Sequence, residues 1–291
     1  MNQRRDFLKQ AGLLSAMSLL RPGALFAAPA ALPLGLQLYT LRDFIGKDVK
    51  GVLAKVAKAG YAEVETYGYS REKGFWGLSA KEFKAVLTDV GLTTTSGHYD
   101  LSSFVGEGKQ EVLQACLEAA ATTGQTYVVV PYLPEELRKT RDDFSRIADK
   151  LNQLGGLCRA AGLRAAYHSH EFEFKPVDGQ TQYKVMLTKT DPALVDFELD
   201  VYWAVLAGQD PVKFMAAHPG RFALWHVKDR DKTQPDRTTA VGAGSIDYPK
   251  IFQHAQAAGL KRVFMEQEYF AADPYPSITQ SAAYIKKKLL S

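Results

Sequence analysis

The feature that most constrains this sequence is a regular alternation of short apolar segments with amphipathic helical periods. Eight strand-like segments are predicted, at 34–39, 62–67, 92–98, 126–132, 163–170, 194–202, 222–229 and 262–268. A helical period follows each, and six of these periods end in a glycine, which suits the left-handed conformation at a helix end. Eight strands alternating with eight helices predict an α/β fold, a (β/α)₈ TIM barrel that forms a single domain over residues 31–291.

A doubly wound open sheet is the alternative reading of the same alternation. Such sheets usually have a glycine-rich turn after their first strand, where a nucleotide binds. The stretch "LQLYTLRD" at 36–43 follows the first predicted strand and contains no glycine. The barrel is therefore the favoured interpretation.

Residues 1–30 do not belong to the alternation and have the composition of a cleavable signal peptide. Arg4 and Arg5 precede a short apolar run, and "APA" at 28–30 offers small residues for cleavage. The paired arginines predict export by the twin-arginine route and a periplasmic protein. An uncleaved membrane anchor is the alternative, but the run is shorter than the roughly 20 residues that span a bilayer. We therefore expect no stable membrane anchor after cleavage.

The charge of the remaining chain excludes one class of partner. Without the four basic residues and one acidic residue of residues 1–30, the net charge falls from +4 to +1. No cluster of Lys and Arg of the kind that binds nucleic acid remains, so DNA and RNA are not expected as partners. The two cysteines, Cys116 and Cys158, fall in helical periods and are interpreted as buried free thiols, with a disulfide as the alternative.

Polar side chains gather at the carboxyl ends of the predicted strands, which is where TIM barrels place their active sites. The polar residues at these ends are Tyr39, Glu65, His98, Tyr132, His168, His170, Asp200, His226, Lys228, Glu266 and Glu268. Within a strand they share one face, since side chains two residues apart point the same way. Polar faces would be costly against the helix layer, so we expect them to point into the mouth of the barrel.

Four of these residues form a predicted metal site. His168, Asp200, His226 and Glu266 lie at the same end of four consecutive strands. Imidazole nitrogens with carboxylate oxygens suit a divalent transition metal. We expect one divalent ion, manganese first, with cobalt, zinc, iron and nickel as alternatives.

The sequence resembles the xylose isomerase-like barrels, a family that includes sugar isomerases, ketose 3-epimerases and inosose dehydratase. The similarity rests on "LQLYTLRD" at 36–43, "YHSHEFEF" at 167–174, "HVKD" at 226–229 and "GAGSID" at 242–247. In this family the metal is typically bound by Glu, Asp, His and Glu on strands 5 to 8. The resemblance therefore implies Asp200, His226 and Glu266 as ligands, whereas His168 stands where epimerases have Glu. Trp203 occupies a position that is histidine in many epimerases.

The strand positions and the family resemblance together suggest a role for each candidate residue. Glu266, His168 and Lys228 are predicted to be catalytic, with Glu266 as proton acceptor and Lys228 beside the developing oxyanion. His170 would face substrate or orient a ligand, and Glu173 is either a second carboxylate of the site or a loop residue. The predicted substrate contacts are Tyr39, Glu65, Trp76, His98, His170, Glu173, Trp203 and Glu268.

The leading functional interpretation is a metal-dependent sugar isomerase or epimerase that acts on an unphosphorylated sugar or sugar derivative. The reaction would begin with removal of a proton next to a carbonyl, because a bound cation stabilises the resulting enediolate. One alternative is a lyase or dehydratase that acts on a keto-sugar or a 3-keto-glycoside. Another is a sugar-binding protein without catalysis. An endonuclease IV-like enzyme is disfavoured by export and by the near-neutral charge, and a homo-oligomer stays open.

Overall fold

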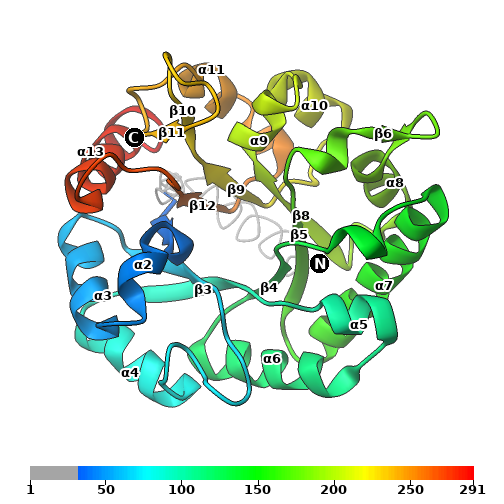
Figure 1. Cartoon of the computed structure of the whole chain (residues 1–291), viewed down its shortest axis with the longest axis horizontal. Coiled ribbons are helices and arrows are strands. Elements are labelled where there is room, and N and C mark those ends of the chain that lie inside the picture. The colour runs from blue at the N-terminus through cyan, green and yellow to red at the C-terminus, as the bar shows by residue number, and fades with distance from the viewer. Residues whose placement is uncertain (1–31) are drawn as a thin grey trace, which may run out of the picture. The chain divides into compact units, whose positions relative to one another are not determined.

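The described part of the chain, residues 32–291 of a computed structural model, is built around a closed barrel of eight parallel strands (Figure 1). The barrel strands are β1 (Leu34–Gln37), β2 (Glu63–Thr66), β3 (Thr93–His98), β4 (Tyr127–Val130), β5 (Arg164–His168), β8 (Val195–Asp200), β9 (Leu224–Val227) and β12 (Arg262–Met265). Each strand pairs with the strand before it, and β12 closes the ring against β1. The predicted TIM barrel is confirmed.

Helices surround the barrel, as Figure 1 shows. They are α2 (Arg42–Ile45), α3 (Val49–Lys58), α4 (Ala80–Asp89), α5 (Ser102–Glu107), α6 (Gln110–Thr123), α7 (Arg141–Ala160), α8 (Gln182–Lys189), α9 (Val201–Leu206), α10 (Pro211–Ala217), α11 (Tyr248–Phe252), α12 (Ala255–Ala258) and α13 (Pro274–Lys288). Two hairpins lie outside the barrel, β6 (Pro176–Val177) with β7 (Gln180–Thr181), and β10 (Asp229–Arg230) with β11 (Thr238–Thr239).

Every predicted strand extends one or more residues beyond the observed strand, and two segments show the clearest differences. The strand predicted at 194–202 ends at Asp200, because the Asp200 side chain accepts a hydrogen bond from Trp203 N–H and begins α9 directly. The helical period expected between the strands predicted at 222–229 and 262–268 is split into α11 and α12.

Side chains alternate between two apolar cores. On β5, Ala165 and Tyr167 pack outward against the helices, whereas Ala166 belongs to a small cluster inside the barrel. That inner cluster contains Tyr127, Val129, Ala166, Ala223, Leu224 and Phe264. Above Ala166, Leu224 and Phe264, two residues further along each strand, come His168, His226 and Glu266. The predicted placement of the polar strand faces inside the barrel is therefore confirmed.

Gly35 on β1 is required by the inner core. A Cβ atom at this position would lie 2.2 Å from a ring carbon of Phe264, which is fully buried. The phenyl ring therefore fills the space above the β1 backbone and forms the floor below the polar mouth.

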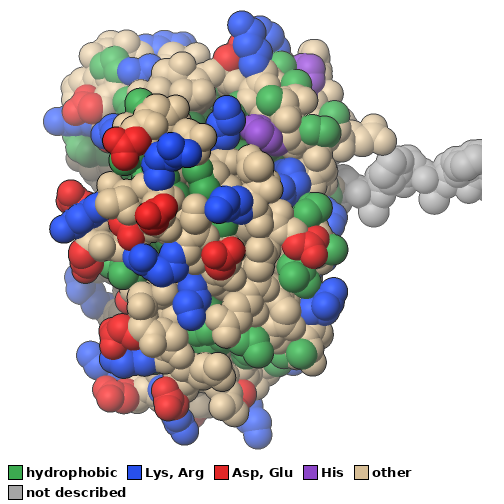
Figure 2. Space-filling view, turned by 90° about the vertical axis from the view of Figure 1, so that its right-hand side faces the viewer, with side chains coloured by type: hydrophobic (Ala, Val, Ile, Leu, Met, Phe, Trp, Pro, Cys, Tyr) green, Lys and Arg blue, Asp and Glu red, His purple; other side chains and the backbone are tan. Residues whose placement is uncertain are grey.

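The remaining predictions about the whole chain have different outcomes. Cys116 and Cys158 are buried free thiols, as predicted. Within residues 32–291, no helix is long and apolar enough to span a membrane. On the face shown in Figure 2, basic and acidic side chains are interspersed. The predicted signal peptide, its twin-arginine motif and periplasmic export depend on residues 1–30, which lie outside the described residues, and stay predictions.

Candidate active site and metal centre

A cavity of about 470 Å³ lies at the carboxyl ends of the barrel strands. Its lining combines aromatic side chains with a small set of charged groups, which is typical of small-molecule sites. It is lined by Tyr39, Tyr67, Gly68, Tyr69, His98, Asp100, Pro131, Tyr132, His168, His170, Trp203, Lys228, Glu266 and Glu268. Most of the residues predicted at the strand ends are brought together here.

The four predicted metal ligands form one compact set. His168, Asp200, His226 and Glu266 each offer a donor atom, and these atoms all lie within 4.8 Å of one another. His168 Nε2 is 3.6 Å from Asp200 Oδ2, and His226 Nδ1 is 3.1 Å from Glu266 Oε2. All four residues are buried. Two nitrogen and two oxygen donors at these separations could hold a divalent cation.

One donor atom of this set, His168 Nε2, is buried and has no hydrogen-bond partner within residues 32–291, which is costly unless another group satisfies it. Asp200 Oδ2 is also buried and contacts the Lys228 ammonium at 3.0 Å. The other nitrogen of His168, Nδ1, lies 3.2 Å from the Pro131 carbonyl oxygen. When Nδ1–H donates there, Nε2 presents its lone pair to the centre of the set, as a metal-binding histidine does. The residues present therefore fit a divalent metal.

Glu65 lies beneath the set and orients His226. Its Oε2 is 2.7 Å from His226 Nε2, so it accepts the proton of that nitrogen and leaves Nδ1 free to face Glu266. Gln37 donates to the same oxygen at 2.7 Å, and Ser96 donates to Oε1 at 2.5 Å. A carboxylate–histidine pair of this kind fixes the ring and its tautomer for metal binding.

A second group of ligand type lies deeper in the barrel, around Glu198. Glu65, His98, Glu198 and His226 have donor atoms within 4.8 Å of one another. Glu198 Oε2 is 2.7 Å from His98 Nε2, and its Oε1 is 3.4 Å from His226 Nε2. Burial opposes ionisation of Glu198, but the two imidazoles hold its pKa well below the ordinary value. These contacts explain the presence of Glu198: it supports the rings of His98 and His226 from below.

Lys228 is a buried ammonium on the wall of the cavity. Its Nζ lies 3.0 Å from Asp200 Oδ2, 2.8 Å from Glu266 Oε2 and 2.6 Å from Glu268 Oε1. Burial lowers the pKa of Lys228, but these carboxylates raise it well above its ordinary value. Lys228 is therefore a charged group that contacts two of the candidate ligands.

His170 and Glu173 form a unit at the cavity edge. The His170 backbone N–H donates to Glu173 Oε2 at 2.7 Å, and Tyr167 donates its hydroxyl to Glu173 Oε1 at 2.8 Å. Burial lowers the pKa of His170 well below its ordinary value, so its ring is neutral at physiological pH. His170 Nδ1 is buried and has no hydrogen-bond partner in the described residues.

Three predicted substrate contacts lie outside the lining of this cavity. Glu65 and Glu173 are fully buried and absent from the cavity lining, because each is turned toward a histidine that it orients. Trp76 packs against Tyr67 and Phe83 and also lies outside the lining. The predicted contacts Tyr39, His98, His170, Trp203 and Glu268 do line the cavity.

Sequence reasoning missed Glu198, Asp100, Tyr67 and Tyr69 as site residues. Glu198 lies two residues before Asp200 on the same strand face, so strand alternation was the signal that could have identified it. Asp100 follows β3, and Tyr67 and Tyr69 follow β2, where loop conformation decides which side chains reach the cavity.

Comparisons with known proteins agree with this geometry. The model of the family described as "Xylose isomerase-like TIM barrel" matches residues 53–288. The crystal structure of a sugar phosphate isomerase/epimerase from Parabacteroides distasonis is 30% identical, with a TM-score of 0.79, and the match covers 92% of this chain and 98% of that chain.

Curated relatives include inosose dehydratases. The Geobacillus thermodenitrificans enzyme is 25% identical over 232 residues, which cover 72% of this chain and 76% of that enzyme. The Lacticaseibacillus casei enzyme is 27% identical over 165 residues, which cover 50% of this chain and 55% of that enzyme. The chain thus spans about half the length of the Lacticaseibacillus casei enzyme and about three quarters of the Geobacillus enzyme.

Proposed function

Because this chain belongs to the xylose isomerase-like TIM barrel family, we propose that it is a divalent-metal-dependent sugar isomerase or epimerase. Its substrate would be an unphosphorylated sugar or sugar derivative, from which it removes a proton next to a carbonyl. The observation that supports this proposal is the set of four buried donors at the cavity, of which His168 Nε2 has no hydrogen-bond partner within residues 32–291. Manganese is the first candidate for the ion, and His168, Asp200, His226 and Glu266 would hold it.

The residues around this set have distinct chemical tasks. A bound divalent cation would supply Lewis-acid stabilisation of negative charge on a substrate oxygen. Lys228 adds a second positive charge next to Asp200 and Glu266, and a preorganised charge stabilises a developing oxyanion without reorganisation. Tyr39, Tyr132 and Trp203 line the cavity and offer ring faces to the sugar.

Glu266 is the proposed proton acceptor. Burial opposes its ionisation, but Lys228 and His226 hold the pKa of Glu266 well below its ordinary value. Glu266 is therefore a carboxylate at neutral pH and can take the C–H proton, leaving the electron pair in an enediolate. Return of a proton to the same carbon from the opposite side gives epimerisation, and return to the neighbouring carbon gives isomerisation.

Elimination is the second candidate reaction, and His168 favours it. Two opposed carboxylates can transfer protons on both faces of a carbon, but here the β5 position is an imidazole directed at the ligand set. With a leaving group on the carbon β to the carbonyl, the same enediolate breaks that C–O bond. The leaving oxygen then takes a proton from an acid such as His98, which lines the cavity. The inosose dehydratases among the relatives support this candidate.

The test is proton exchange by the metal-loaded protein in deuterium oxide. A screen of keto- and aldo-sugars, including 3-keto-glycosides, should identify a substrate that incorporates deuterium. Glu266→Gln keeps the size of the side chain and removes its basicity, so exchange should fall by about 10²–10⁴-fold. Glu171→Gln is the matched control, because Glu171 is a surface residue paired with Lys175 outside the cavity.

Each outcome has a distinct meaning. Exchange without loss of substituents supports isomerisation or epimerisation, and exchange with release of a leaving group supports the lyase. Near-normal exchange by a Glu266→Gln protein that retains its metal would show that another group takes the proton. A wild type that binds sugar but shows no exchange in any sugar even after metal loading would support the non-catalytic sugar-binding protein instead.

A further inference from the structure

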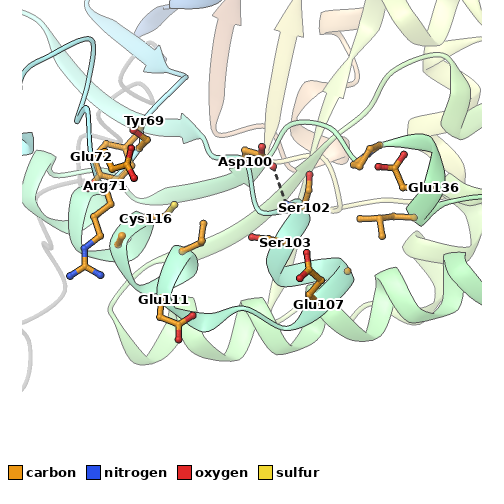
Figure 3. A pocket seen from close by; sticks show the side chains of 16 residues that line it. Tyr69, Arg71, Glu72, Asp100, Ser102, Ser103, Glu107, Glu111, Cys116 and Glu136 are labelled. Atoms are coloured by element: carbon orange, nitrogen blue, oxygen red, sulfur yellow. Dashed lines mark hydrogen bonds between the residues drawn. The ribbon is translucent and has the colours of Figure 1, made fainter.

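A second cavity, of about 800 Å³, lies next to the one that contains the ligand set. It is bounded by residues 69–72 after β2, by α5, by the first half of α6 and by residues 134–137 after β4 (Figure 3). Tyr69 and Asp100 line both cavities. The two spaces are therefore neighbours that meet at these two side chains, and we call the second one the side cavity.

The lining of the side cavity is acidic and rich in hydroxyl groups. Its carboxylates are Glu72, Asp100, Glu107, Glu111 and Glu136, its hydroxyls include Ser70, Ser102 and Ser103, and its one cation is Arg71. Figure 3 shows the carboxylates distributed around the space. Glu107 pairs with Lys109 at 2.8 Å, whereas the other four carboxylates have no ion pair within residues 32–291. Such a wall repels anions.

The same wall also has an apolar part. Tyr69, Val112, Ala115, Cys116 and Leu137 contribute carbon and sulfur surface between the carboxylates. Val112 is 39% exposed, so its side chain adds accessible carbon surface to this wall. A sugar ring has hydroxyl groups at its edge and C–H groups on its faces. The carboxylates of this wall can accept hydrogen bonds from the hydroxyl groups, and the apolar side chains can pack against the C–H groups.

We propose that the side cavity is a second subsite, which binds the non-reacting sugar unit of a neutral glycoside. This inference rests on the proposed function, which puts the reacting sugar in the central cavity. The glycosidic bond would then pass between Tyr69 and Asp100. The substrate class is therefore an unphosphorylated disaccharide or similar glycoside, in preference to a free monosaccharide.

The charges of both cavities argue against a sugar phosphate. In the central cavity the cation Lys228 already contacts three carboxylates, at 2.6–3.0 Å. In the side cavity the single Arg71 is outnumbered by carboxylates. A phosphate group is favoured by an excess of cations or by backbone N–H donors, whereas carboxylates outnumber Lys and Arg in both linings.

The test compares binding and turnover with two matched variants on α6. Val112→Trp fills the side cavity from an exposed position, and Gln114→Trp puts the same ring on the exposed surface outside the lining. The probes are neutral glucose disaccharides of different linkage, together with glucose and glucose 6-phosphate, added to the manganese-loaded protein and followed by calorimetry. The 3-keto derivatives of the same sugars are the probes for turnover.

We expect at least one disaccharide to bind at least about tenfold more tightly than glucose. Val112→Trp should weaken that disaccharide by about tenfold and leave glucose unchanged, and Gln114→Trp should change neither. On 3-keto substrates, Val112→Trp should raise KM for the disaccharide with little change in kcat. These results would establish the subsite even if the chemistry proved to be elimination.

The proposal is overturned if no disaccharide in the panel binds more tightly than glucose, or if Val112→Trp and Gln114→Trp behave alike. It is also overturned if glucose 6-phosphate binds more tightly than every neutral disaccharide. Because calorimetry needs no turnover, these results are separate from failure of the proposed function. That failure would appear as absent deuterium exchange in all sugars, with disaccharide binding intact.

Discussion

His168 illustrates how a single strand position acquires its role from its neighbours. Strand alternation predicted that its ring points into the barrel, and the structure confirms this. The His168 Nδ1 atom lies next to the carbonyl oxygen of Pro131, the residue that follows β4. This contact depends on the register between β4 and β5. A sequence pattern cannot supply this register. The same reason explains Glu65, whose predicted cavity contact is replaced by a bond to His226 across the barrel.

Glu173 leads to a prediction about pH. Burial raises the pKa of Glu173 to about 7, against the lowering effect of Tyr167 and His170. The folded protein therefore keeps this proton up to about pH 7, whereas the unfolded chain releases it near pH 4.5. The contribution of Glu173 to the free energy of unfolding is therefore lost as the pH rises from 4.5 to about 7, and the loss is complete above pH 7. The effect is of the order of 3 kcal/mol, at about 1.4 kcal/mol per pKa unit.

Glu173→Gln preserves the neutral form at every pH and should remove this dependence. The free energy of unfolding of the variant relative to wild type should rise between pH 4.5 and pH 7, measured by urea denaturation. Glu171→Gln is the control, because its exposed side chain pairs only with Lys175. A constant difference between Glu173→Gln and wild type across this range would contradict the prediction.

At the scale of elements, regular strands and long helices were predictable, and short elements were not. Helices such as α3, α4, α6 and α7 span enough turns to show an amphipathic period. By contrast, α5 and α9 have six residues each, too few for a recognisable period. The loop from Asp229 to Asp247 contains only the short β10–β11 hairpin, and its internal order depends on one side chain.

That side chain is Asp229, which is fully buried at the start of the loop. Its carboxylate accepts backbone N–H groups of Arg230, Gly242, Gly244 and Ile246 at 2.8–3.1 Å. Gly244 is needed for this close approach, since a Cβ atom there would lie 2.2 Å from Asp229 Oδ1. The carboxylate therefore brings the β10–β11 hairpin and the segment before α11 together.

Asp229→Ala should loosen this loop without unfolding the barrel. Four N–H groups lose their acceptor, and we expect a loss of about 2–4 kcal/mol, since each unsatisfied buried group costs about 1–3 kcal/mol and some become hydrated. Hydrogen exchange should accelerate at residues 230–246 and remain slow in the barrel strands. Asp236→Ala, an exposed position in the same loop, is the control. Unchanged exchange in Asp229→Ala would contradict this account.

At the scale of the whole molecule, the barrel brings together ligands that are 98 residues apart in sequence, from His168 to Glu266. A cation that binds all four strands links β5, β8, β9 and β12, and it binds only the folded chain. Metal binding should therefore stabilise the entire fold. At a free metal concentration of about 100 times Kd, the gain is about 2.7 kcal/mol, which raises the Tm by roughly 5–10 °C for a domain of this size.

The decisive comparison is the metal-dependent rise in Tm of three variants, whose substituted residues lie within, beneath and outside the ligand set. Asp200→Asn keeps the Oδ1 cap of α9 and changes only Oδ2, and Lys228 keeps its contacts with Glu266 and Glu268, so the apo protein should stay folded while the metal-dependent rise in Tm is lost. Glu65→Gln should keep the rise but require about 10–100-fold more metal, because Glu65 orients His226 without contacting the ion. Glu268→Gln lines the cavity outside the set and should respond like wild type. An equal rise in Asp200→Asn and wild type, measured by calorimetry after chelation and manganese addition, would place the metal elsewhere.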